Sequence, residues 1–349
     1  IRDRISPLIV GVPGPHLNQS EFAVLEKVRP AGIILFSRNI ATAEQTRGLV
    51  ACFKELEPRP FVAVDLEGGL VNRLSTLWGD LPSPSAAARA GRRAVRELGE
   101  AAGASCRALG IHLDLAPVVD LDRPEGLIPL QGRCFGHDPE RVATLARVFN
   151  DGLAAWGVAG CLKHFPGMGS VVADTHEELP TLAGDNHEEH MAVFLALSRE
   201  IPLVMMGHAI APAVGDADRP ASLSRRAVDR AAHLPGSPVI LSDDLEMGAL
   251  SGMGSLPDLV VEALRARNHG VLVCKAFDQL LAIMELIDEA SEADSILATR
   301  LAETTSRLGT LARDLLRNAA AVPVPLDETV AQLWERARRS VATAEGQRK

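Results

Sequence analysis

Short apolar runs, rich in Val, Ile and Leu, recur along the chain, and amphipathic helical patterns fill the intervals between them. Eight such runs have the length and the flanking turn residues of buried strands. They cover residues 7–12, 32–36, 61–64, 112–117, 158–162, 202–206, 238–241 and 270–274. The intervening helices are expected at 20–28, 43–56, 92–109, 139–156, 187–200, 224–232, 256–268 and 278–287. Strands that alternate with helices predict a parallel sheet.

Eight strand–helix units are the number that closes a (β/α)8 barrel of the TIM type, in which functional side chains gather at the C-terminal ends of the strands. Polar residues do follow the apolar runs in this chain. They are Arg38, Asn39, Asp65, Glu67, Asp120, Asp122, Lys163, His164, His208, Asp243, Asp244 and Lys275. A doubly wound open sheet is the competing architecture, but it does not require polar groups at every strand end. The pattern therefore favours an α/β protein with a single barrel.

The last part of the chain continues with two amphipathic patterns at 289–319 and 326–344, joined by a link that contains proline. We expect these to be extra C-terminal helices. One catalytic barrel domain is therefore predicted over 1–349, with the barrel at about 1–290 and the helical extension at about 291–349.

Composition narrows the function. The chain has 349 residues, of which 47% are hydrophobic and 23% charged, which is typical of a globular protein. A net charge of −9, with 3% aromatic residues and no Tyr, argues against nucleic acid or an anionic membrane as the main partner. The five cysteines are widely spaced without a CxxC pair, and no apolar run approaches the ~20 residues of a membrane span. We expect a cytoplasmic protein with reduced thiols.

The stretch 158–180 concentrates the candidate chemistry. Its apolar start leads to Lys163 and His164, after which glycines and a proline predict a long loop that carries Asp174 and His176. In an extended loop, two residues that are two apart share a side, so Asp174 would orient the His176 imidazole. Such a dyad suits general acid/base chemistry near neutral pH. An isolated pair of this kind is often incidental, and this one becomes informative only beside other polar strand ends.

Asp243 belongs to the sequence VILSDDLEM, where two carboxylates directly follow a run that should be buried on all sides. A helix N-cap is the simpler interpretation for one aspartate. Two adjacent aspartates permit both roles, with Asp243 over the barrel mouth as a nucleophile and Asp244 as the cap or an orienting group.

Asp65, Arg133 and Lys163 are the types of residue that hydrogen-bond a polyhydroxylated ligand, and a salt-bridge cluster at the barrel rim is the alternative. Glu67, at a tight turn before two glycines, is given a structural role, and Met247 is more typical of a core residue. A metal site is the sharper alternative, but the chain has neither an HxH strand motif nor an HExxH helix. That site would draw on Asp65, His164, His176, His208 and Asp243.

Seven collinear segments resemble the β-N-acetylhexosaminidases of glycoside hydrolase family 3, in particular the compact single-domain bacterial type. The segments are GIILFSRNI (32–40), VDLEGGLVNRL (64–74), LAPVVDLD (115–122), GRCFGHDPE (132–140), KHFPGMGSVVADTH (163–176), PASLS (220–224) and SDDLEM (242–247).

The resemblance implies a retaining, two-step hydrolysis that removes terminal β-linked N-acetylglucosamine. It assigns the nucleophile to Asp243 and the general acid/base to His176, which Asp174 would hold. It also implies that the sugar contacts Asp65, Arg133, Lys163 and His164 and that Met247 and His208 line the site. Family members of this type commonly act in the cytoplasm on peptidoglycan-recycling fragments and need no metal or cofactor. We expect a monomer with a small-molecule carbohydrate substrate.

The chain departs from the family in two motifs. The usual DQEGGRV is DLEGGLV here, so that Leu66 and Leu70 replace Gln and Arg, and the usual KHFPGHGD has Met168 and Ser170. Because polar groups are lost at these positions while the candidate catalytic residues are kept, we expect an altered sugar specificity rather than a loss of activity. The alternatives are a β-glycoside phosphorylase and a sugar-binding protein with weakened catalysis.

Overall fold

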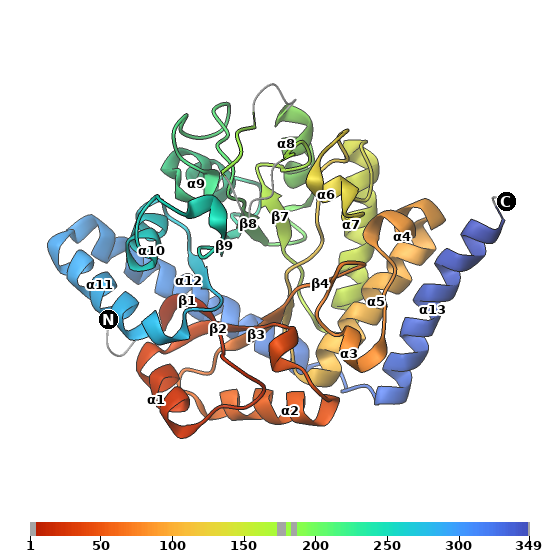
Figure 1. The fold of residues 1–349 in the computed structure, drawn as a ribbon, viewed down its shortest axis with the longest axis horizontal. Helices are drawn as coiled ribbons and strands as arrows, with labels where there is room; N and C mark the ends of the chain where they lie inside the picture. Colours follow the sequence, from red (N-terminus) through yellow and green to blue (C-terminus); the bar gives the residue numbers. More distant parts are fainter. Residues whose placement is uncertain (1–4, 173–178, 183–186, 348–349) are drawn as a thin grey trace.

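Eight parallel strands form the centre of the molecule in the computed structural model, which describes residues 5–172, 179–182 and 187–347 (Figure 1). Their order in the sheet is β6-β3-β2-β1-β10-β9-β8-β7. Single parallel bridges, Leu113 to Ala159 and Val118 to Lys163, join the chain around β6 to the chain around β7, so the sheet closes on itself. The strands are β1 (Ser6–Gly11), β2 (Pro30–Leu35), β3 (Phe61–Val64), β6 (Leu113–Asp114), β7 (Leu162–Phe165), β8 (Leu203–Met206), β9 (Val239–Asp244) and β10 (Gly270–Val273). The predicted (β/α)8 barrel is confirmed.

Helices surround the barrel, and the eight predicted ones are present: α1 (Gln19–Val28), α2 (Ala43–Cys52), α5 (Arg92–Leu109), α7 (Pro139–Ala154), α8 (His187–Leu197), α9 (Arg225–Ala232), α10 (Leu256–Arg265) and α11 (Leu280–Ala293). Local sequence sets their ends. The side chain of Asp138 accepts a hydrogen bond from the Arg141 amide at the start of α7, and α5 ends at Gly110, whose φ of 79° suits glycine.

Several short elements were not predicted. They are the hairpin β4 (Leu66–Gly68) and β5 (Val71–Asn72), helices α3 (Ser75–Trp78), α4 (Pro84–Ala90) and α6 (Leu127–Leu130), and the 3-10 turns η1 (Ser37–Asn39), η2 (Phe53–Glu55), η3 (Ala221–Leu223), η4 (Gly248–Leu250) and η5 (Phe277–Gln279). Most lie in the connections that follow the strands, where barrel enzymes carry their sites.

Strand residues alternate between two cores. Leu8 and Val10 face the surrounding helices, whereas Ile9 lies in the barrel interior with Ile34 and Leu241. Because both faces are apolar, each strand has the continuous run of hydrophobic residues that made it recognisable in the sequence.

The fifth strand was predicted too early, by four residues at its start and by three at its end. The expected run at 158–162 is mostly the approach to the strand, and β7 spans Leu162–Phe165, so that Lys163 and His164 are strand residues. Asp243 likewise lies within β9 rather than after it. Polar side chains are tolerated in these strands because charged partners surround them at the barrel mouth.

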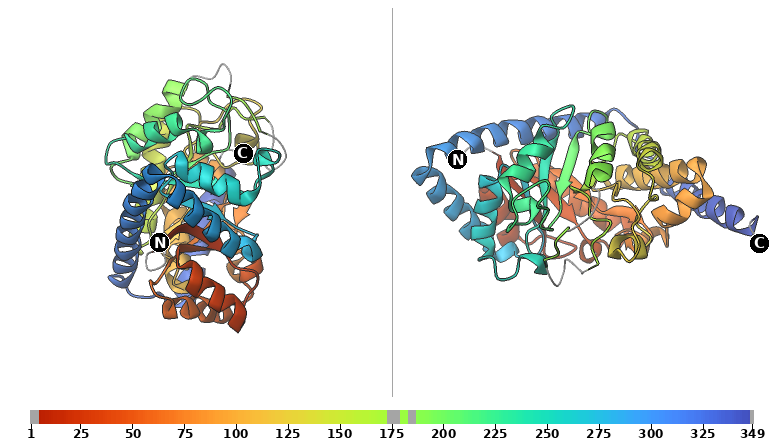
Figure 2. Two further views of the ribbon diagram at one scale, coloured as in Figure 1. Left: turned by 90° about the vertical axis from the view of Figure 1, so that its left-hand side faces the viewer. Right: turned by 90° about the horizontal axis from the view of Figure 1, so that it is seen from above.

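The two predicted C-terminal helices are α12 (Ser295–Ala320) and α13 (Asp327–Gly346). Leu308, Ala312 and Leu315 of α12 pack into the barrel interior, and the Thr305 hydroxyl donates to the carbonyl of Ile5, just before β1. Helix α12 therefore closes the barrel at the N-terminal ends of its strands (Figure 2). The functional pocket must open at the other end.

Helix α13 packs outside the barrel along α5 and α4 (Figure 1). Its Trp334 is fully buried, and the indole Nε1 donates to Ser105 Oγ at 2.7 Å. The division near residue 290 stays a prediction. None of the helices in the described ranges combines the length and the apolar character that a membrane crossing requires.

Candidate active site

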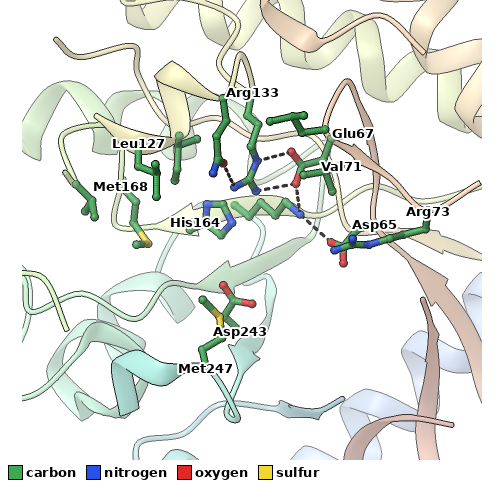
Figure 3. A pocket seen from close by; sticks show the side chains of 15 residues that line it. Asp65, Glu67, Val71, Arg73, Leu127, Arg133, His164, Met168, Asp243 and Met247 are labelled. Atoms are coloured by element: carbon green, nitrogen blue, oxygen red, sulfur yellow. Dashed lines mark hydrogen bonds and ion pairs between the residues drawn. The ribbon is translucent and has the colours of Figure 1, made fainter. Parts of the chain in front are cut away.

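A pocket of about 290 Å³ opens at the C-terminal ends of the strands, and six of the predicted site residues line it together (Figure 3). These are Asp65, Arg133, Lys163, His164, Asp243 and Met247. The other residues in its lining are Glu67, Leu70, Val71, Arg73, Leu127, Ile128, Gln131, Met168 and Val171. Residues far apart in the sequence thus meet because parallel strands present their C-terminal ends at the same rim.

Charged side chains lie on one side of the pocket, and we call them the charged wall: Asp65, Glu67, Arg73, Arg133 and Lys163. Ion pairs join all of them except Arg73 into a network. Lys163 Nζ lies 2.9 Å from Asp65 Oδ1 and 2.6 Å from Glu67 Oε1. Arg133 donates to both oxygens of Glu67, at 2.7 and 2.8 Å. This bidentate geometry fixes the guanidinium in one orientation.

The ion pairs keep Glu67 and Lys163 charged despite their burial. Burial alone would raise the pKa of Glu67, but the charges and hydrogen bonds of Arg133 and Lys163 hold that pKa well below its usual range. Burial would lower the pKa of Lys163, yet Asp65 and Glu67 raise it above its ordinary value. Glu67 was expected to have a structural role at a turn, whereas the structure places it in the pocket lining, paired with Arg133 and Lys163.

The β4–β5 hairpin turns the chain sharply after Asp65 and places Glu67 in the pocket. Gly68 and Gly69 have φ values of 96° and 60°, which favour glycine. A Cβ atom on Gly68 would lie 2.3 Å from the carbonyl oxygen of Pro82, so no larger residue fits there.

His164 is oriented by Asp120, a fully buried carboxylate. Nδ1 of the ring lies 2.7 Å from Asp120 Oδ2, and Oδ1 accepts a hydrogen bond of 2.7 Å from the Met168 amide. Burial alone would raise the pKa of Asp120, but His164 and the Met168 amide lower it. Because Asp120 occupies Nδ1, Nε2 is the ring nitrogen of His164 that can contact a ligand.

Asp243 is half-buried in β9, and its Oδ1 accepts a hydrogen bond of 2.8 Å from the Asp244 amide. Burial would raise its pKa, but His164, His208 and that amide lower it. The neighbouring Asp244 has its pKa raised to about 6, mainly by burial and further by the charges of Glu246 and Asp243. Two adjacent carboxylates are thus pushed toward different protonation states, a pattern typical of catalytic sites.

His208, expected to line the site, lies behind it instead. It is buried, with Nδ1 2.7 Å from Ser222 Oγ and Nε2 2.8 Å from the carbonyl oxygen of Asp244. It therefore acts on Asp243 through electrostatics and on the β9 backbone through its hydrogen bond. Asp174 and His176 lie outside the described residues, and their roles stay predictions.

Sequence reasoning missed Arg73 and understated Asp120. Arg73 lines the pocket eight residues after Asp65, on the far side of the hairpin, and its guanidinium lies 5.7 Å from the centre of the Phe36 ring. Within the described ranges no carboxylate pairs with it. The partner of Asp120 is 44 positions away in the chain, so no local pattern could reveal the pair.

The other side of the pocket is apolar. Leu127 and Ile128 of α6, together with Met168 and Val171 from the segment after β7, form what we call the apolar wall. The Leu127 amide donates to the Val171 carbonyl at 2.7 Å, which ties the two segments together. In Figure 3, Leu127 and Met168 lie opposite Glu67, Asp65 and Arg73, with His164 and Asp243 between them.

Among the residues that the structure describes, no group of three His, Cys, Asp or Glu side chains has the geometry to hold a metal ion. Arg133, Lys163 and Arg73 can donate hydrogen bonds to hydroxyl groups, Asp65 can accept them, and an ionised Asp243 faces the same space. A barrel with such a pocket at its C-terminal rim has the design of an enzyme that acts on carbohydrates.

Comparisons with known proteins agree with this class. The model of the glycosyl hydrolase family 3 N terminal domain matches residues 1–310. The chain belongs to glycoside hydrolase family 3, and it is a glycosidase. A β-hexosaminidase of Xylella fastidiosa is 34% identical over 323 residues, which are 88% of this chain and 92% of the relative.

Solved structures show the same similarity. A glycoside hydrolase family 3 β-N-acetylglucosaminidase from Paenibacillus sp. superposes with a TM-score of 0.85 at 27% identity, over 96% of this chain and 67% of its own. NagZ from Neisseria gonorrhoeae in complex with N-trifluoroacetyl-D-glucosamine gives a TM-score of 0.73 at 28% identity, over 98% of both chains.

Proposed function

We propose that this family 3 glycosidase hydrolyses terminal β-linked N-acetylglucosamine with retention of configuration, with Asp243 as its nucleophile. The observation that carries the proposal is the position of Asp243 at the barrel mouth, opposite a wall of side chains suited to sugar hydroxyls, where His164 and His208 lower its pKa. The names of the similar proteins, β-hexosaminidase and β-N-acetylglucosaminidase, support the sugar assignment.

The proposed reaction combines Asp243 with the acid/base role that the sequence resemblance implies for His176. A carboxylate oxygen of Asp243 attacks the anomeric carbon, the bond from that carbon to the glycosidic oxygen breaks, and His176 gives its proton to the departing oxygen. His176 then takes a proton from a water molecule, which attacks the same carbon and releases Asp243. Asp174 would stabilise the protonated imidazole. Asp65, Arg133, Lys163 and His164 would hold the sugar in place, and Arg73 would add a further donor.

The decisive variant is Asp243→Asn, which keeps the shape of the side chain and removes its charge. We expect the release of p-nitrophenol from p-nitrophenyl β-N-acetylglucosaminide to fall by roughly 10³-fold or more, about 4 kcal/mol in the barrier. Asp229→Asn, on the outer helix α9, is a matched control. Wild-type turnover by the Asp243→Asn protein would contradict the assignment.

The role of His176 has its own test. His176→Ala should lower kcat/KM, which reports the first step, for substrates whose leaving group needs a proton, and should spare kcat/KM for the acidic 2,4-dinitrophenolate leaving group. Equal losses on both kinds of substrate would assign the acid/base role to another residue.

Phosphorolysis is the second candidate, because Arg73 places an arginine without a carboxylate partner in the pocket, where it could bind phosphate. If phosphate speeds turnover and yields a sugar 1-phosphate, the enzyme is a phosphorylase. If turnover does not depend on phosphate, it is a hydrolase. Action on peptidoglycan fragments, cytoplasmic location, the monomeric state and independence from metal and cofactor stay predictions.

A further inference from the structure

Three large hydrophobic side chains are exposed on the segments that line the pocket, and we call them the apolar rim: Leu70, Leu130 and Val172. Their exposed fractions are 74%, 75% and 65%. Leu70 itself lines the pocket, Leu130 ends the short helix α6 that supplies Leu127 and Ile128, and Val172 directly follows Val171 of the apolar wall. The rim thus consists of one exposed lining residue, Leu70, and of two exposed residues that are sequence neighbours of the lining residues Gln131 and Val171.

The charged wall and the apolar rim lie at different depths in the pocket. Glu67 and Lys163 of the charged wall have only 1% and 3% of their side chains exposed, so the hydrogen-bonding groups lie at the bottom of the pocket. Ile128, Met168 and Val171 are buried in a small apolar cluster of their own, and the rim lies beyond them at the surface. A ligand that extends out of this pocket leaves the charges at its inner end and meets hydrocarbon at its outer end.

The proposed reaction fixes which part of the substrate lies at each end. The terminal sugar carries the hydroxyl groups, so it takes the charged wall. Asp243 attacks the anomeric carbon from the side opposite the departing oxygen, so the aglycone points away from Asp243 and toward the mouth. The exposed apolar rim is therefore the part of the protein that the aglycone touches.

We propose that this enzyme selects an uncharged, largely apolar aglycone, of the aryl or alkyl class, which packs against the apolar wall and the apolar rim. The inference rests on the proposed function and specifies its substrate. Exposed apolar residues that gather next to a pocket indicate a binding surface, whereas single exposed leucines elsewhere on a protein are common and need no explanation. Every charged residue that lines the pocket, among those described, is on the charged wall or is His164 or Asp243, so a charged aglycone would find no ionic partner on the apolar wall.

Alkyl β-N-acetylglucosaminides test the proposal, because methyl and hexyl glycosides have leaving groups of similar acidity and differ mainly in apolar area. We expect kcat/KM for the hexyl glycoside to exceed that for the methyl glycoside by roughly tenfold or more, the gain that burial of about two methylene groups provides. A ratio near one in the wild-type protein overturns the proposal.

Variants of the apolar rim test whether these residues cause the preference for the hexyl glycoside. In the double variant Leu70→Gln, Leu130→Gln we expect the hexyl-to-methyl ratio to fall to about threefold or less. Leu326→Gln is the matched control, because Leu326 is 74% exposed, as Leu70 is, but lies between α12 and α13, away from the pocket. An unchanged ratio in the double variant overturns the proposal, as does an equal fall in the control. Thermal unfolding of each variant verifies that it is folded.

Two further measurements test whether the apolar surface binds the aglycone or the N-acyl group of the sugar. Hexyl and methyl 1-thio-β-N-acetylglucosaminides, measured by calorimetry, should show the same preference in Kd without turnover. If lengthening the N-acyl group from acetyl to butanoyl gives the gain and lengthening the aglycone does not, the apolar surface serves the N-acyl group and the proposal is wrong. The wild-type protein could turn over the p-nitrophenyl substrate, lose this activity in Asp243→Asn, and still show a hexyl-to-methyl ratio of one. That result would support the proposed function and overturn this inference alone. No turnover of any glycoside overturns both.

Discussion

The charged wall and the apolar wall face each other across one pocket, yet they are held in place by different forces. Glu67, Arg133 and Lys163 lock one another through short ion pairs. Leu127 and Val171 share one backbone hydrogen bond and otherwise depend on packing. Ion pairs with fixed geometry position a ligand accurately, whereas packed hydrocarbon accepts varied shapes. We infer that the enzyme is strict about the sugar and tolerant about the shape of the apolar group attached to it.

Removing Glu67 should break the charged wall most severely. Glu67→Ala leaves Arg133 and Lys163 buried without their shared partner, and we expect a loss of about 3–5 kcal/mol in the free energy of unfolding, measured by urea denaturation. Activity should fall as well, because Arg133 loses its orientation. The control is Glu97→Ala on α5, a buried glutamate whose partners lie on the protein surface. If the two variants were equally stable, the charged wall would not be a special network.

Asp120 tests whether orientation of His164 matters apart from stability. Asp120→Asn keeps one acceptor for the Met168 amide and weakens the hold on the imidazole, so we expect kcat/KM to fall by about 10–100-fold, about 1.4–2.8 kcal/mol. A fall in stability with an unchanged kcat/KM would indicate a purely structural residue.

The apolar wall should tolerate change far better. Met168→Leu conserves volume in the apolar cluster, and we expect a cost below about 1.5 kcal/mol in stability, measured by thermal unfolding. Turnover of the p-nitrophenyl substrate should change less than in the Asp120 variant. A larger loss than that of Glu67→Ala would reverse the comparison between the walls.

The number and order of the strands could be predicted because both faces of each strand are buried, which leaves long apolar runs in the sequence. The boundaries of β7 could not, since Lys163 and His164 are strand residues that only distant carboxylates make acceptable. The same distance hid the role of Glu67, whose partner Arg133 is 66 positions away. Asp65, Lys163 and Asp243 were predicted together because each lies at the C-terminal end of a strand. The periodicity of apolar residues therefore predicts the strands and helices of the barrel. It cannot predict ion pairs between residues that are far apart in the sequence, because these residues meet only in the folded protein.

Helix α12 has a consequence for the way the protein is made. A nascent chain that has reached residue 290 contains all eight strands, but Leu308, Ala312 and Leu315 have not yet been synthesised. The interior residues Ile9 and Leu241 are then without their cover at the base of the barrel. The base of the barrel is therefore sealed only after these residues of α12 have been added, and until then the barrel interior exposes apolar side chains that favour aggregation.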